Sequence, residues 1–351
     1  MARRTQAAVV HYGLSELAVE LREMPVPEIG DDDVLLEVGA VSVCGSDVHQ
    51  AYNRHSWRVN LPVILGHEFS GTVAKAGKNV GQFREGDRVA SETAAEICGT
   101  CLMCRSGRYN LCPSRRGFGY GAHGAMTSYV KVPWRCLHHV PDGLPLEHAC
   151  LSEPCAVAYH AMCVNAVVRP GDLVVIVGPG PIGLLCARLA ALGGADPLVV
   201  AGRRADGPRL EVARKLGATR TVDVDAEGIE AVVRGYHPLG AEVVCDASGS
   251  SRPLEVCFRL VQPGGRIVKV GWSPDALPLD VNPLVQKNVT LQGSFSHTYP
   301  MWEKVIHLLH AGRLMPELLI GLKTGLSDWK RAFVAMHEGS VLKSLLVPEK
   351  P

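Results

Sequence analysis

The sequence lacks a long apolar run, an excess of either charge and any internal repeat. No stretch of about 18 or more apolar residues occurs, so the sequence predicts no membrane-spanning helix. The 36 basic and 35 acidic side chains leave a net charge of +1, which offers no basic surplus for a nucleic-acid backbone. Residues 5–20 contain no continuous apolar stretch, so we expect no signal peptide and a cytoplasmic protein.

The length of 351 residues exceeds one ordinary hydrophobic core and favours two domains. The first part of the chain is rich in Gly, Pro and short Val-rich runs, such as residues 34–38, 71–73 and 87–90. Short strands separated by frequent turn residues are typical of an irregular, barrel-like β domain.

From about residue 172 onward the pattern alternates between strands and helices. Residues 173–177 form a continuous apolar run, which predicts a buried parallel strand. Residues 181–192 place apolar side chains at helical spacing. We expect further strands at 197–201, 241–246, 265–270 and 289–293, and further helices at 209–216 and 253–260. This alternation predicts an α/β fold with a doubly wound parallel sheet, after which the tail returns to the first domain.

A glycine-rich loop follows the strand at 173–177 and opens the next helix. It reads Gly178-Pro179-Gly180-Pro181-Ile182-Gly183, the G-x-G-x-x-G pattern in its dinucleotide-binding context. Gly178 permits the tight turn, Gly180 lets the backbone approach a pyrophosphate, and Gly183 allows close helix–strand packing. The helix N-terminus adds free N–H groups and a positive dipole. The sequence therefore predicts a nicotinamide dinucleotide site.

The residues after the second strand of this domain indicate which dinucleotide binds. An acidic residue there would bind the ribose 2′-hydroxyl of NAD. The chain has Arg203 and Arg204 instead, and guanidinium groups suit a 2′-phosphate. Asp206 lies close by and is the alternative partner for a 2′-hydroxyl, so NADP is favoured over NAD without excluding it.

Four cysteines are crowded in a short lobe. Cys98, Cys101, Cys104 and Cys112 supply four thiolates, the ligand set of a closed structural zinc site. The alternatives are a redox or disulfide role and a nucleic-acid zinc ribbon, and the near-zero net charge disfavours the ribbon. The other cysteines are expected to be small buried hydrophobes; they are Cys136, Cys150, Cys155, Cys163, Cys186, Cys245 and Cys257.

Several motifs in order resemble the zinc-containing branch of the medium-chain dehydrogenase/reductase superfamily. They are residues 44–49 (CGSDVH), 66–68 (GHE), 86–89 (GDRV) and 107–112 (GRYNLC), the Glu153-Pro154 pair, the four-cysteine lobe and the glycine loop. The chain most resembles the polyol (sorbitol) and threonine dehydrogenases, over nearly its whole length. The resemblance implies a GroES-like β-barrel catalytic domain at 1–153, completed by 296–351, and a Rossmann domain at 154–295. It also implies a homodimer or homotetramer.

The resemblance further implies a catalytic zinc bound by Cys44, His67 and Glu153. Glu68 would lie beside the metal as an alternate ligand, whereas Cys155 is out of register. Ser46 occupies the proton-relay position, His49 lies near the exit of that relay, and Asp47 would fix the ligand geometry. Which of Glu68 and Glu153 binds the metal at each stage stays open.

The activity implied is hydride transfer between NAD(P) and a secondary alcohol or ketone of a polyol, cyclitol or sugar-derived substrate. Ser296 and His297 replace the Arg-Tyr pair of sorbitol enzymes, and Gln50 stands where an aromatic residue is common. We therefore expect Ser46, Ser296 and His297 in an altered substrate pocket, with Asn53, Arg54, His55 and Glu92 as weaker candidates. The alternatives are a threonine-type or 2,3-butanediol dehydrogenase and a non-catalytic cofactor-binding protein.

Overall fold

The computed structural model describes residues 4–250, 252–273, 276 and 279–349. The chain divides into two compact units. The first comprises Met1–Glu153 with Thr298–Pro351, and the second comprises Pro154–His297. The second unit thus extends slightly beyond the boundary expected at residue 295. None of the helices in the described residues is long and apolar enough to cross a membrane.

The first unit is built on a seven-stranded sheet. Its strand order is β15-β16-β3-β5-β6-β8, with β7 also paired to β3. The strands are β3 (Asp33–Ser42), β5 (Glu68–Ala76), β6 (Arg88–Ser91), β7 (Tyr129–Pro133), β8 (Leu137–His139), β15 (Ile320–Gly325) and β16 (Lys343–Val347). Along β3, buried and half-buried residues alternate because successive side chains point to opposite faces. A smaller sheet joins β1 (Thr5–His11) to β2 (Val19–Pro25) and β4 (Val63–Ile64).

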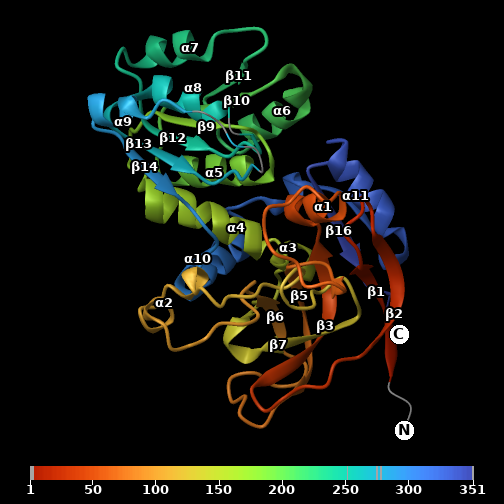
Figure 1. The fold of residues 1–351 in the computed structure, drawn as a ribbon. Helices are drawn as coiled ribbons and strands as arrows, with labels where there is room; N and C mark the ends of the chain where they lie inside the picture. Colours follow the sequence, from red (N-terminus) through yellow and green to blue (C-terminus); the bar gives the residue numbers. More distant parts are fainter. Residues whose placement is uncertain (1–3, 251, 274–275, 277–278, 350–351) are drawn as a thin grey trace. The chain divides into compact units, whose positions relative to one another are not determined.

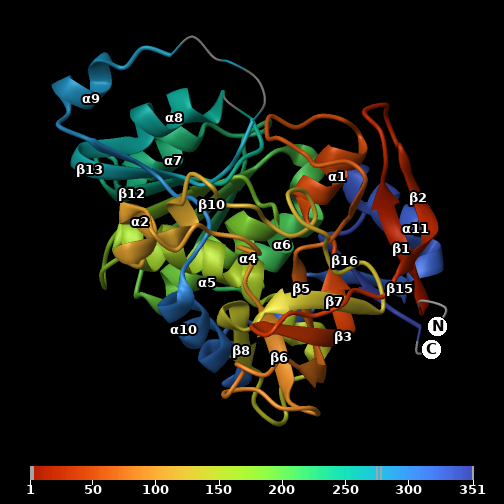
Figure 2. The ribbon, with the colours of Figure 1, turned by 60° about the horizontal axis from the view of Figure 1, so that its bottom comes forward.

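The last part of the chain completes the sheet that its first part begins. Strand β16 pairs antiparallel with β3, so that Leu346 lies opposite Val41. Figure 2 shows these blue C-terminal segments interleaved with the red N-terminal strands. The helices of this unit are α1 (Gly45–Ala51), α2 (Leu102–Arg105), α3 (Leu146–Ala149), α10 (Tyr299–His310) and α11 (Trp329–His337). Helix α4 (Ser152–Tyr159) crosses the boundary between the units.

The second unit is a six-stranded parallel sheet with helices packed against it (Figure 1). Its strands are β9 (Val174–Val177), β10 (Leu198–Gly202), β11 (Arg220–Asp223), β12 (Ala241–Asp246), β13 (Val261–Lys269) and β14 (Thr290–Gly293). Their spatial order, β11-β10-β9-β12-β13-β14, is the Rossmann order 3-2-1-4-5-6. The helices are α5 (Pro181–Leu192), α6 (Gly207–Lys215), α7 (Ile229–Tyr236), α8 (Pro253–Leu260) and α9 (Asn282–Gln286). The expected α/β fold class is confirmed.

Local differences from the sequence-based expectation have physical causes. Strand β13 begins at Val261 rather than at residue 265, because its ladder with β12 continues through a register shift beside Gly264. Strand β11 and helix α7 were not expected from the sequence. The expectation that Cys163 is buried is wrong. It is exposed, because it lies on the outer side of a π-helical turn whose Ala161 and Met162 face inward.

Candidate active site and metal centres

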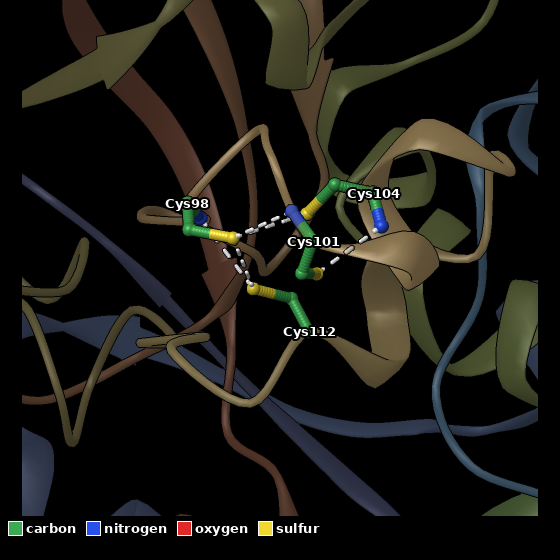
Figure 3. Close-up of side chains that lie close together, drawn as sticks. All are labelled: Cys98, Cys101, Cys104 and Cys112. Atoms are coloured by element: carbon green, nitrogen blue, oxygen red, sulfur yellow. Dashed lines mark hydrogen bonds between the residues drawn. The ribbon is translucent and has the colours of Figure 1, made fainter.

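The four cysteines of the lobe converge on one point (Figure 3). Their sulfurs all lie within 4.8 Å of one another. The Cys98 sulfur is 3.6 Å from that of Cys112 and 3.9 Å from that of Cys104. Ligands about 2.3 Å from a central ion at tetrahedral angles are about 3.8 Å apart, so the spacing fits a tetrahedral zinc site.

Backbone N–H groups of the lobe donate to the same sulfurs. Cys101 N–H points at the Cys98 sulfur (3.3 Å), Cys104 N–H at the Cys101 sulfur (3.4 Å) and Cys98 N–H at the Cys112 sulfur (3.4 Å). The bond from the Cys101 backbone, with help from Thr100, lowers the pKa of Cys98 to about 6. Burial, followed by hydrogen bonds among the thiols, raises the pKa of Cys104 to about 12. The lobe therefore stabilises negative charge at the Cys98 sulfur, and a metal ion bound there would displace protons from the other thiols.

A second cluster unites Cys44, His67 and Glu68. One ligand atom from each lies within 4.8 Å of the other two. Cys44 is the N-cap of α1, and its backbone N–H donates to the Asp47 carboxylate at 2.9 Å. Glu68 opens β5 directly after His67, and β5 pairs with β3 so that Glu68 lies opposite Ser42. The end of one strand and the start of its neighbour thus bring the thiol, imidazole and carboxylate together.

The ring of His67 is held by two neighbours. Its Nδ1 lies 3.4 Å from the Asp47 carboxylate, and its Nε2 lies 3.3 Å from the Ser46 hydroxyl. Burial alone would lower the pKa of His67, but the charges of Asp47 and Cys44 outweigh it and raise that pKa well above the usual range. A carboxylate behind one ring nitrogen is the usual support of a histidine metal ligand.

Sequence reasoning missed Lys343. Its ammonium group lies 2.6 Å and 2.5 Å from the two Glu68 carboxylate oxygens and 3.1 Å from the Val43 carbonyl. Both side chains are buried, at 2% and 0% exposure. The available signal was a lysine in the otherwise apolar strand KSLLV, because a lysine in a buried strand needs a partner.

Glu153 lies outside the cluster of Cys44, His67 and Glu68. It is buried in the first turn of α4, and its charge contributes to the raised pKa of Lys343. Glu153 therefore lies near the ammonium group that pairs with Glu68. The carboxylate that the structure groups with the thiol and the imidazole is Glu68. Cys155 is fully buried.

The glycine loop has the geometry of a phosphate-binding turn. Gly178 has φ of +100°, and a Cβ on Gly183 would lie 1.9 Å from the Gly178 carbonyl oxygen. A Cβ on Gly180 would meet nothing within 4 Å, so that residue faces open space at the start of α5. Pro181 and Ile182 form the first turn of that helix. The loop is closed on the protein side and open on the side where a pyrophosphate would bind.

Arginines gather at the tip of β10. Asp206 accepts from the Arg203 backbone N–H at 2.9 Å and lies 3.5 Å from the Arg209 guanidinium. The Arg203 side chain lies 3.8 Å from Asp225, and that of Arg204 lies 3.7 Å from Asp223. The pairs of Arg203 and Arg204 are exposed and therefore weak, so these arginines can readily pair with another anion.

The remaining candidates lie in two different places. Ser46 and His49 are on α1 of the first unit, and Ser296 and His297 are in the second unit, where the Ser296 carbonyl lies 2.8 Å from the His160 ring. Gln50 is buried and donates to the Gly119 carbonyl at 2.9 Å. Glu92 is also buried, where it accepts from Tyr109 and His138.

Comparison with known proteins agrees with this geometry. Residues 30–142 match the family model "Alcohol dehydrogenase GroES-like domain", and residues 181–311 match "Zinc-binding dehydrogenase". The chain is 37% identical to a D-arabitol-phosphate dehydrogenase of Enterococcus avium, over 92% of both chains. It is 35% identical to a sorbitol dehydrogenase of Halalkalibacterium halodurans, over 96% of this chain and 97% of the relative.

A solved structure of similar fold is a zinc-binding dehydrogenase from Sinorhizobium meliloti bound to NADP. It is 28% identical, with a TM-score of 0.91, over 99% of this chain and all of the other. Family models, relatives and fold all agree with the resemblance carried by the motifs. The chain therefore belongs to the zinc-containing medium-chain dehydrogenase/reductase family, in its polyol and threonine dehydrogenase branch, as an oxidoreductase that acts on secondary alcohols.

Proposed function

We propose that this enzyme transfers a hydride between NADP and a secondary alcohol or ketone of a small polyol, cyclitol or sugar-derived substrate. The observation that supports the proposal is the cluster of Cys44, His67 and Glu68. Its thiol, imidazole and carboxylate converge, with ligand atoms within 4.8 Å of one another. Three protein ligands leave one coordination position open, which distinguishes a catalytic zinc site from a closed structural one. The first compact unit would serve as the catalytic domain and the second as the cofactor domain.

The donor set fits zinc, with Cys44 and His67 as fixed ligands and Glu68 or Glu153 as the third. When bound, zinc supplies a Lewis acid for the substrate oxygen, and the nicotinamide accepts or supplies the hydride. Asp47 orients the ring of His67, and Lys343 balances the charge of Glu68. These contacts hold the ligands in place before the substrate binds.

Ser46 and His49 would carry the proton of the substrate hydroxyl outward. The Ser46 hydroxyl lies beside His67 within the cluster, and His49 lies on the same helix at an exposed position. Loss of hydration lowers the pKa of His49, and His337 and Arg54 lower it further. A neutral imidazole at working pH can accept that proton.

The second unit would bind the dinucleotide at Gly178, Gly180, Pro181, Ile182 and Gly183. The preference for NADP rests on Arg203 and Arg204, whose weak ion pairs leave them able to bind a 2′-phosphate. Arg209 adds a third positive charge beside Asp206, and Asp206 already accepts a backbone hydrogen bond of its own loop.

A second zinc would occupy the lobe of Cys98, Cys101, Cys104 and Cys112 in a purely structural role. We also propose Ser296 and His297 as substrate-pocket residues, a cytoplasmic location and assembly as a homodimer or homotetramer. None of the twelve cysteines, all of which lie in the described residues, is in a disulfide, which is compatible with a reducing compartment.

The test combines metal analysis with a substrate panel. The purified chain should contain about two zinc ions, one of which is lost in a Cys44→Ser variant together with activity. Sorbitol, inositols, threonine and 2,3-butanediol, each with NADP and NAD, separate the polyol proposal from the amino-alcohol and diol alternatives. A chain that holds only the lobe zinc and reduces neither cofactor with any of these substrates would favour the non-catalytic alternative.

A Glu153→Gln variant and a Glu68→Gln variant, compared for zinc content and kcat, decide which carboxylate completes the site. Loss of zinc in only one of them identifies the resident ligand. Cys163→Ser is the matched control, because that thiol is exposed and lies outside both clusters.

A further inference from the structure

A second pocket of the first unit carries charge that the proposed function does not use. It has a volume of about 470 Å³, which is within the usual range of ligand pockets. Its lining includes three arginines (Arg58, Arg115 and Arg116) and one carboxylate (Glu96). We call it the arginine pocket.

The walls of the arginine pocket are held in place by the fold. Glu96 and Arg116 exchange two backbone hydrogen bonds of 3.0 Å. The Arg115 guanidinium donates to the Thr93 hydroxyl at 2.7 Å and to the Tyr120 hydroxyl. The pocket therefore presents its guanidinium groups on a fixed frame rather than on a loose loop.

Two of the arginines are available to an incoming anion. Arg58 is exposed and makes no ion pair with any residue in the described part of the chain. Arg116 is 56% exposed, and its contact with Glu96 is a single 3.5 Å approach at the surface. Such a pair is weak, so a doubly charged oxyanion that accepts two hydrogen bonds would displace it.

The arginine pocket lies close to the cluster of Cys44, His67 and Glu68. Its wall residue Tyr120 follows Gly119, and a Cβ on Gly119 would lie 3.1 Å from the backbone nitrogen of Gly66. Gly66 directly precedes His67. Adding this contact to the covalent distances on either side of it places the Cα atoms of Tyr120 and His67 no more than about 14 Å apart. The same loop is held by Gln50 of α1, the helix that Cys44 caps.

We propose that the arginine pocket binds a phosphate group of the substrate, so that the preferred substrate is a phosphorylated polyol. This inference rests on the proposed function, because it assigns the far end of the molecule whose hydroxyl reacts at the cluster. A phosphate monoester carries about −1.5 to −2 charges at neutral pH, and arginine pairs with it in bidentate fashion. From a secondary carbon to the phosphorus, an extended five-carbon polyol phosphate spans roughly 6 Å, which lies within the upper bound of about 14 Å between Tyr120 and His67.

A different role for these arginines is to offset the negative charge of the cysteine lobe. Cys98 also lines the pocket, and four thiolates around one zinc ion leave a net charge of about −2. In that case removal of an arginine would loosen the lobe zinc and would affect all substrates alike. Zinc content and the comparison of substrates distinguish the two roles.

The experiment uses the full chain, loaded with zinc, in the direction of alcohol oxidation. kcat/KM is measured for D-arabitol against D-arabitol 1-phosphate and for sorbitol against sorbitol 6-phosphate. The variants are Arg58→Gln and Arg116→Gln. The control is Arg84→Gln, an arginine of the same unit whose side chain is 89% exposed.

We expect the phosphorylated polyols to be preferred, and each pocket variant to raise their KM about tenfold while zinc content and the weak activity on free polyols stay unchanged. Equal kcat/KM for free and phosphorylated polyols would overturn the phosphate site but leave the proposed function intact. A uniform loss of activity together with loss of zinc would also overturn it, in favour of charge compensation of the lobe.

A binding measurement keeps the proposal testable if none of the polyols is oxidised. Inorganic phosphate is titrated into the zinc-loaded chain with NADP saturating, so that the arginines near β10 are occupied, and binding is followed by ³¹P NMR line broadening. Broadening that disappears in Arg58→Gln but not in Arg84→Gln supports the site. Identical broadening in both variants contradicts it.

Discussion

The buried pair of Lys343 and Glu68 allows a sharp prediction about the stability of the catalytic unit. In a Lys343→Met variant, the Glu68 carboxylate loses a partner at 2.5 Å and stays at a position with 0% exposure. Removing one member of a buried ion pair costs about 3–5 kcal/mol, because the other charge is left uncompensated. Burial alone would lower the pKa of Lys343, but the surrounding negative groups, Glu68 first among them, together outweigh burial and raise that pKa. The stability that comes from the ammonium group is therefore fully present below the ordinary lysine pKa and is lost as the pH rises through the raised pKa, so neutral pH lies within that window.

The assay is urea unfolding at pH 7.5 in the presence of a chelator, followed by tryptophan fluorescence. Of the five tryptophans, only Trp272 belongs to the second unit, so the signal reports mainly on the first. With a urea dependence of roughly 2–3 kcal/mol per molar, the midpoint should fall by about 1–2.5 M. Added zinc should recover part of this loss, because a cation beside Glu68 replaces the missing ammonium group.

Two further variants test whether the loss comes from a buried, uncompensated charge. Lys323→Met removes a lysine from an ion pair of similar length, 2.7 Å to Glu147, but at 54% exposure, and should cost no more than about 1 kcal/mol. Lys343→Met combined with Glu68→Gln should recover most of the loss, because no buried charge remains. The account of a buried compensating charge is wrong if Lys343→Met has the same urea midpoint as Lys323→Met. It is also wrong if the double variant is less stable than Lys343→Met alone.

Three other predictions follow from the sites. Cys112→Ser should lose about one of two zinc ions by metal analysis, because three thiolates leave the tetrahedral lobe incomplete; retention of both ions would contradict a structural zinc there. His337→Ala should move the acidic limb of the pH profile of kcat/KM upward, toward the ordinary pKa of 6.5, because His337 helps to lower the pKa of His49; an unmoved limb would remove His49 from the proton path. Arg203→Gln with Arg204→Gln should lower kcat/KM with NADP by about 10- to 100-fold and leave NAD unaffected, and equal losses with both cofactors would argue against a 2′-phosphate site.

The sequence predicted the Rossmann sheet and its glycine loop because both depend on local patterns. Helix α5 spans Pro181–Leu192 as expected, since its apolar face and its starting proline lie in one short segment. Strand β11 was not predicted because Arg220–Asp223 holds only one aliphatic residue, Val222. The strand is buried by the neighbouring strand and helix. A short strand of this kind is defined by its partner and not by its own composition.

The metal cluster was predictable in part. Cys44, His67 and Glu68 occur in recognisable motifs, so the resemblance identified them and the structure brings them together. Lys343 lies 275 residues beyond Glu68 in the chain, and no local pattern links the two. The same holds for Gln50, which the resemblance places where the substrate should lie, and whose hydrogen bond to the Gly119 carbonyl no local pattern indicated. Contacts across the fold decide these roles, and a single sequence does not contain them.

The position of Lys343 also bears on how two carboxylates could serve the proposed zinc site. Glu68 pairs with its ammonium group directly, and Glu153 is close enough to raise its pKa as well. One buried cation can compensate one extra carboxylate, so the carboxylate that does not bind the metal still has a partner. Without that cation, the unused carboxylate would be an uncompensated buried charge, and the site would be restricted to one ligand arrangement. The lysine therefore makes exchange between Glu68 and Glu153 electrostatically permissible in the proposed zinc site, where Cys44 and His67, beside Asp47, would hold the ion.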